Sequence, residues 1–182
     1  LPERTRQQMR TALGNGARQL MELSVPAGTD GALFETLLAE YNADYAAHCR
    51  IETAPYPGVD ALLQQLHAQG RKLAIVSNKP DEAVRALRTE FFADTVPIAV
   101  GEKQSIRRKP APDTLLTAMV QLGAERTSTV YVGDSEVDIA TARAAGLPCI
   151  SVLWGFRDRD VLEQAGAQQF AADTGELARL LD

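Results

Sequence analysis

The sequence predicts an α/β protein in which a parallel sheet carries helices on both faces and follows a helical region. After residue 57, short apolar stretches alternate with amphipathic stretches, the pattern of repeated strand–helix units. Before residue 55 the spacing of apolar residues is helical. Pro55-Tyr56-Pro57-Gly58 interrupts both patterns. We therefore expect a helical domain over residues 1–54 and a sheet domain over residues 55–182.

Three helices are expected in the first region. Apolar residues recur at spacings of three and four over Glu3 to Leu13, Ala17 to Leu23 and Gly31 to Cys49. Gly14-Asn15-Gly16 and Pro26-Ala27-Gly28 carry turn residues and should separate these helices.

The sheet domain should begin with a helix over Val59 to Gln69 and a short apolar strand over Lys72 to Val76. Pro80 suits the first turn of the helix that follows, because its missing amide would be unpaired there in any case. A weaker strand is expected over Val96 to Val100. It contains Pro97, which cannot donate to a sheet ladder and therefore suggests an edge position.

A helix over Asp113 to Leu122 should then lead to a buried, β-branched strand over Thr129 to Val132. The helix after it should end at Gly146, a residue suited to a helix C-terminus. The remaining expected elements are helices over residues 135–145, 158–165 and 174–181 and a strand over residues 149–153.

Composition narrows the possible functions. The net charge of −5 over 182 residues gives no general attraction to nucleic acid or to acidic lipid. No apolar run approaches the roughly 20 residues needed to span a bilayer. Cys49 and Cys149 are too few and too far apart for a disulfide framework, so a reducing compartment fits. We expect a cytoplasmic monomer or homodimer with no nucleic-acid or membrane partner.

Polar residues follow two of the predicted strands at the point where each strand ends. Ser77 and Asn78 come directly after the strand 72–76, and Asp134 comes just after the strand 129–132. In parallel α/β sheets, ligands bind beyond the carboxyl ends of the strands, so these side chains should share one rim. A hydroxyl and an amide near a helix N-terminus suit phosphate, although they also suit an ordinary helix start.

Asp134 is the candidate metal ligand. Gly133 before it lets the backbone turn sharply, and a carboxylate at a strand end is a hard oxygen ligand that suits Mg²⁺. Asp138 lies four residues later on the same helical face, where it could ligate the metal, hold a metal-bound water or orient Asp134. Alternatively, Asp134 or Ser135 caps the helix and Asp138 favours its positive end.

Lys109 is the candidate phosphate-binding cation. Pro110 and Pro112 restrict the loop that carries it and so limit where its side chain points. A solvated lysine in a basic loop is the alternative, because Arg107 and Arg108 precede it directly.

These segments, in this order, resemble the motifs of the haloacid-dehalogenase-like phosphatase superfamily. Ser77-Asn78 resembles its second motif, Lys109-Pro110 its third, and Gly133-Asp134 with Asp138 its fourth. Residues 57–182, with Trp154-Gly155-Phe156, are similar to bacterial phosphoglycolate-phosphatase-like members. Residues 1–54 resemble part of that group's helical cap, and the segment from Leu13 to Arg18 resembles its substrate-facing loop.

The resemblance implies a Rossmann-like core with a cap, and a Mg²⁺-dependent phosphatase. In the superfamily, the first aspartate of a DxDGT motif attacks phosphorus and forms an aspartyl phosphate, and the second acts as acid and base. If these roles are carried over, Asp134 and Asp138 would belong to the metal site. Ser77 and Asn78 would bind phosphate, and Lys109 would stabilise the phosphate and the nucleophile. Arg18 would reach a substrate carboxylate from the cap, unless it is a surface arginine.

One departure from the superfamily is severe, because no DxDGT occurs in residues 1–182. In the superfamily this motif ends a central strand that lies between the strands expected here at 72–76 and 129–132. We therefore expect the first strand and part of the cap to lie upstream, in about 30–40 residues by the superfamily's layout. Leu1 in place of an initiator Met agrees. The chain as written is expected not to turn over substrate.

The leading hypothesis is a phosphatase of a small phosphorylated metabolite, with phosphoglycolate as first candidate. A sugar phosphomutase of the same superfamily is the alternative, and a halide-releasing dehalogenase is less favoured because it does not need the carboxylate of Asp134. An inactive, truncated relative that binds phosphate or a partner is the third possibility.

Overall fold

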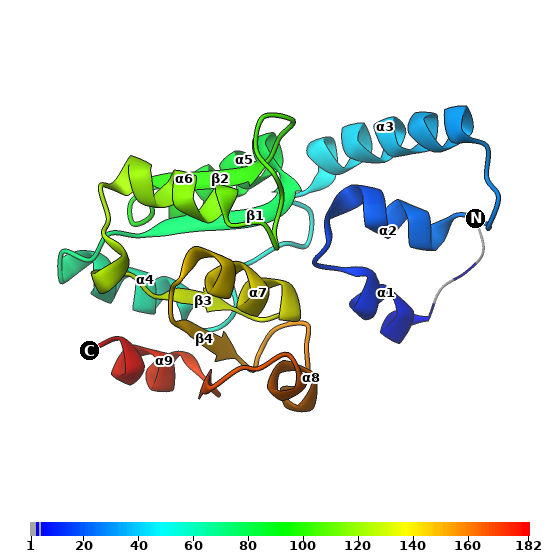
Figure 1. Cartoon of the computed structure of the whole chain (residues 1–182). Helices are drawn as coiled ribbons and strands as arrows, with labels where there is room; N and C mark the ends of the chain where they lie inside the picture. The colour runs from blue at the N-terminus through cyan, green and yellow to red at the C-terminus, as the bar shows by residue number, and fades with distance from the viewer. Residues whose placement is uncertain (1–2, 4) are drawn as a thin grey trace.

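The computed structural model describes residue 3 and residues 5–182. The helices before the first strand are α1 (Arg6–Ala12), α2 (Gly16–Ser24), α3 (Gly31–His48) and α4 (Val59–Ala68). Strands and helices then alternate: β1 (Ala74–Pro80), α5 (Asp81–Phe92), β2 (Ile98–Glu102), α6 (Asp113–Leu122), η1 (Arg126–Ser128), β3 (Tyr131–Gly133), α7 (Glu136–Ala145), β4 (Cys149–Val152), α8 (Arg159–Gln164), β5 (Gln169–Ala171) and α9 (Thr174–Leu181). Figure 1 shows the alternating part on one side and α1–α3 on the other.

All strand pairs within the described residues are parallel, as the alternation of strands and helices predicts. The strands form two sheets there, one of β1 and β2 and one in the order β3-β4-β5. One apolar cluster joins α4 and α9 to β4 and β5, and another joins α6 and α7 to β3. Helices therefore cover both faces, and the predicted α/β class is confirmed.

Helices α2 and α3 share an apolar cluster that is separate from those of the sheets. Met21, Val25 and Leu38 are buried in it, and Phe34 and Tyr41 pack against them. The segment between His48 and Val59 connects these helices to the rest of the molecule (Figure 1). We call α1–α3 the cap, and the part from α4 onward the core.

The predicted helices over 113–122 and 174–181 match α6 and α9. The strand predicted over 72–76 is instead β1, which begins at Ala74 and runs to Pro80, because pairing with β2 continues as far as Pro80 opposite Glu102. Pro80 therefore ends a strand and precedes α5 rather than lying in its first turn. Strand β5 was not predicted, since its three residues are too short to show a periodicity.

Two expectations from composition can be compared with the structure. Cys49 and Cys149 are both free thiols. Among the described residues, we find no helix with the length and apolar character that a bilayer-spanning segment requires.

Candidate active site

A cavity of about 220 Å³ lies between the cap and the core, at the carboxyl ends of β1 and β3. The α1–α2 turn and α3 form its cap side, and the ends of the two strands, the Lys109 loop and the loop after β4 form its core side. It is smaller than the roughly 300 Å³ at which pockets for drug-sized ligands begin, so it suits a small ligand. The cavity brings together five of the six predicted site residues: Ser77, Asn78, Lys109, Asp134 and Asp138.

Asp134 stands in the turn between β3 and α7. Its Oδ2 accepts a hydrogen bond of 2.7 Å from the amide of Phe156, in the loop after β4. A Cβ on Gly155 would come within 2.2 Å of the Asp134 Cβ, so only glycine allows this loop to pass so close. Burial raises the pKa of Asp134, and the negative charge of the nearby Asp138 raises it further. The hydrogen bond from the Phe156 amide lowers this pKa, but the net shift is upward. A neighbouring cation would therefore stabilise this carboxylate in its charged form.

Asp138 is buried and fully engaged. Its Oδ2 accepts from the backbone amides of Asp134 and Ser135 at 3.1 Å each and from the Ser135 hydroxyl at 2.6 Å. Its Oδ1 accepts from Lys109 Nζ at 2.7 Å and from the Tyr131 hydroxyl at 3.0 Å. Burial raises the pKa of this carboxyl, but the Lys109 charge and these donors outweigh burial and lower the pKa overall. Of the roles open to Asp138, the structure favours orienting the turn that carries Asp134.

The sequence of α7 explains this geometry. Ser135 is the N-cap of α7, and Ser135 and Asp138 form a reciprocal capping box. The alternative role of helix capping therefore applies to Ser135. A Cβ on Gly133 would come within 2.3 Å of the Asp138 side chain. Glycine at this position therefore allows the end of β3 to lie close to the capping box.

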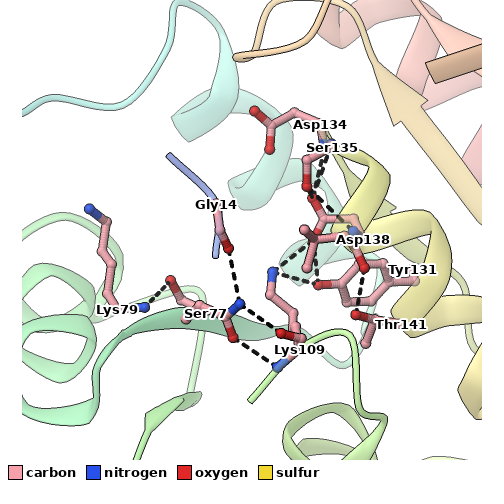
Figure 2. A network of polar contacts seen from close by, with 11 residues as sticks. Gly14, Ser77, Lys79, Lys109, Tyr131, Asp134, Ser135, Asp138 and Thr141 are labelled. Carbon is pink, nitrogen blue, oxygen red and sulfur yellow. Dashed lines mark hydrogen bonds and ion pairs between the residues drawn. The ribbon is translucent and has the colours of Figure 1, made fainter. Parts of the chain in front are cut away.

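Lys109 is a buried lysine rather than a solvated one. Its ammonium bridges Asp138 and the Tyr131 hydroxyl, the latter at 3.2 Å (Figure 2). The neighbouring Arg107 is exposed and pairs with Asp113 instead. The two basic residues therefore have different environments, and Lys109 alone of this pair lines the cavity.

Ser77 and Asn78 lie within the carboxyl-terminal half of β1 and have different roles. The amide nitrogen of Asn78 donates to the carbonyls of Gly14 and Lys109 at 3.0 Å each, and its oxygen accepts from the Lys109 amide at 2.8 Å. Asn78 therefore fastens the Lys109 loop and the cap turn to β1. The Ser77 hydroxyl accepts from the Lys79 amide at 3.1 Å, and among the described residues no acceptor is found for its own proton, which a ligand could therefore accept.

Arg18 is the sixth predicted residue, and the structure does not bring it to the cavity. Its guanidinium forms two hydrogen bonds of 2.8 Å with the exposed Glu35 and lies over the ring of Phe34. Arg18 therefore occupies the outer surface of the cap in this structure.

Sequence reasoning missed Arg157, which connects the cap to the core. This buried arginine pairs with Glu136 at 2.7 and 2.9 Å, which raises its pKa and lowers that of Glu136. It also donates to the carbonyls of Arg10 and Leu13, at 2.8 and 2.9 Å. The signal available in the sequence was its place directly after Trp154-Gly155-Phe156, beyond a strand end.

The residues present fit one part of a magnesium site. Within the described ranges no group of three or more potential ligands gathers at one point. Magnesium needs few protein ligands, because it keeps several waters and takes one or two carboxylates. Asp134 fits such a role, since Oδ2 receives the Phe156 amide while no hydrogen bond to Oδ1 is found among the described residues.

Comparison with known proteins identifies the family of the chain. The sequence model of the haloacid dehalogenase-like hydrolase family matches residues 1–152. Phosphoglycolate phosphatase of Xanthomonas campestris is 34% identical over 158 residues, covering 86% of this chain and 71% of that protein. N-acetylmuramic acid 6-phosphate phosphatase of Pseudomonas aeruginosa is 28% identical and covers 100% of this chain and 81% of that protein.

A solved structure shows the same architecture. The crystal structure of a proposed phosphoglycolate phosphatase from Lactobacillus delbrueckii subsp. bulgaricus superposes on this chain with a TM-score of 0.89. It is 34% identical and covers 98% of this chain and 84% of that chain. The chain therefore belongs to the haloacid dehalogenase-like hydrolase family, in its phosphoglycolate-phosphatase-like group.

Proposed function

We propose that this protein is a Mg²⁺-dependent phosphatase of a small phosphorylated metabolite, with phosphoglycolate as the leading candidate. The observation that carries the proposal is the meeting of Asp134 and the buried Lys109 at one small cavity between cap and core. A carboxylate for a divalent cation and an ammonium for phosphate are the groups that phosphoryl transfer requires. The phosphatase relatives from Xanthomonas and Pseudomonas support the same reaction class.

Each residue has a defined task in this proposal. Asp134 holds the metal, which when bound offsets the negative charge of the transferring phosphoryl group. The Ser77 hydroxyl donates to a phosphate oxygen, and Lys109 places a positive charge beside it. Asp138 and Asn78 act indirectly, because their hydrogen bonds set where Lys109 and the Asp134 turn stand.

The nucleophilic carboxylate, which would form an aspartyl phosphate, is proposed to lie upstream of this chain. Two features of the structure support an additional strand there. Within the described residues β1 pairs only with β2, and β3 pairs only with β4. Val132, in the middle of β3, is 38% exposed although it is an apolar strand residue.

The experiment measures phosphate release from phosphoglycolate, with and without Mg²⁺, by residues 1–182 and by the same chain extended through any sequence that precedes Leu1. Metal-dependent release by the extended chain alone is the expected result. Release by neither chain would contradict the phosphatase proposal and leave the inactive, phosphate-binding relative. Products from a sugar phosphate separate a phosphomutase, which isomerises it, from a phosphatase, which frees inorganic phosphate.

A further inference from the structure

The cations that line the cavity differ in their partners. Lys109 is neutralised by Asp138 at 2.7 Å, and Arg157 is neutralised by Glu136 at 2.7 Å. Lys79 also lines the cavity, but no carboxylate lies within ion-pair distance of it among the residues that the structure describes. Lys79 is therefore a positive charge at the cavity wall that a ligand can neutralise.

Lys79 lies on the far side of Ser77 from Lys109 and Asp134. It follows Ser77 by two residues on β1, and both residues line the cavity. Figure 2 shows Lys79 and Lys109 on opposite sides of Ser77. The cavity wall thus carries Lys109 and Asp134 on one side of Ser77 and Lys79 on the other.

The cap holds Lys79 in place. The Lys79 ammonium lies 4.9 Å from the ring centroid of Tyr45 and contacts the Tyr45 hydroxyl. Tyr45 stacks on Tyr41, with ring centroids 5.9 Å apart, and both rings line the cavity. This wall presents an ammonium and a phenol hydroxyl, which are two donors suited to a second anionic group.

We propose that Lys79, supported by Tyr45, is the specificity-determining residue for substrates that carry a carboxylate as well as the phosphate ester. This inference rests on the proposed function and adds a recognition group to it. A short phosphorylated acid fits because Lys79 and Lys109 share a cavity of only about 220 Å³. A phosphate ester without a carboxylate would leave the ammonium of Lys79 without its anion.

The experiment measures dissociation constants by calorimetry for phosphoglycolate, ethyl phosphate and inorganic phosphate, with the chain extended through any sequence that precedes Leu1 and without Mg²⁺, so that the esters are not hydrolysed. The variants are Lys79→Met, which keeps the chain length but removes the charge, and Tyr45→Phe, which removes only the hydroxyl. Lys72→Met is the matched control, because Lys72 donates to the Gly123 carbonyl away from the cavity. Circular dichroism checks that each variant is folded.

The unmodified protein should bind phosphoglycolate roughly 10- to 100-fold more tightly than ethyl phosphate, the contribution of one charge-assisted hydrogen bond. Lys79→Met should bring that ratio close to one, Tyr45→Phe should lower it in part, and Lys72→Met should keep it.

Three results would overturn the inference in distinguishable ways. If Lys79→Met keeps the ratio between the affinities for phosphoglycolate and ethyl phosphate, Lys79 does not recognise the carboxylate. If Lys79→Met weakens the binding of both esters and of inorganic phosphate equally, Lys79 binds phosphate. The phosphatase proposal then stands, but the proposal that Lys79 recognises a carboxylate fails. If the unmodified protein binds none of the three ligands, the proposed function itself fails.

Discussion

Lys109→Met provides a quantitative test of the buried ion pair on which the site depends. The Lys109 and Asp138 side chains are 10% and 6% exposed and 2.7 Å apart. Removing one partner of such a pair destabilises a protein by about 3–5 kcal/mol, because the other charge stays buried. Asp138 would keep the donors from Tyr131 and Ser135, so we expect the lower end, about 3 kcal/mol.

Arg107→Met is the matched control. Arg107 pairs with Asp113 at 2.8 Å, nearly the same distance, but the Arg107 side chain is 77% exposed. Surface pairs of this kind contribute about 0–1 kcal/mol. Urea unfolding at pH 7 in metal-free buffer measures both variants, and equal m-values establish that the free energies can be compared. A loss in Lys109→Met no larger than that in Arg107→Met would refute the argument from burial.

The same pair predicts how the difference depends on pH. The folded-state pKa of Asp138 lies below its ordinary value, so its stabilisation is complete above the unfolded pKa of about 3.9 and is lost as pH falls through the folded pKa. Without Lys109, burial raises the pKa of Asp138, and acid relieves the unpaired charge. The stability gap between the unmodified protein and Lys109→Met should therefore be widest near pH 7. It should begin to narrow above about pH 3.9, where Asp138 of the folded variant takes up a proton, and should narrow further as pH falls through the lowered folded-state pKa of Asp138 in the unmodified protein. A gap that does not narrow in acid would contradict this assignment.

Three further outcomes are expected. Asp134→Asn should abolish metal-dependent phosphate release by the active protein while its melting temperature is kept, and normal release would remove Asp134 from the metal site. Gly155→Ala should impair Mg²⁺ binding in calorimetry, because its Cβ would lie within 2.2 Å of Asp134; Gly31→Ala, where nothing lies within 4 Å, is the control. Arg157→Met should speed amide hydrogen exchange in residues 10–14, since it removes two hydrogen bonds to their carbonyls, and unchanged exchange would show that the cap turn is held by other contacts.

Local sequence signals accounted for the elements whose cause is local. The helix over 113–122 was predictable from apolar spacing, and Gly123 ends it in the left-handed conformation that glycine adopts readily. The positions of Ser77 and Asp134 at one rim were predictable because parallel strands end on the same side of a sheet. The class of fold and the place of the site follow from these two kinds of signal.

The partners of the site residues were not predictable in this way. Asn78 and Lys109 both carry groups that suit phosphate, yet the structure uses Asn78 to fasten two backbone segments and buries Lys109 against Asp138. The pairing of Arg157 with Glu136 joins residues 21 positions apart, and its hydrogen bonds to the cap reach almost to the other end of the chain. Contacts of that kind have no period and no local spacing.

The sequence by itself thus determined the α/β class, the order of most elements and the residue types that meet beyond the strand ends. Only the tertiary structure decided which polar groups are already satisfied by protein partners and which remain available to a ligand. The physical reason is that hydrogen bonds and ion pairs between distant segments depend on packing. Asp138 and Asn78 are hydrogen-bonded to protein groups. Within the described part of the chain, no hydrogen-bond partner is found for Asp134 Oδ1 or the Ser77 proton and no carboxylate partner for Lys79, which is why we propose these three for a metal or a substrate.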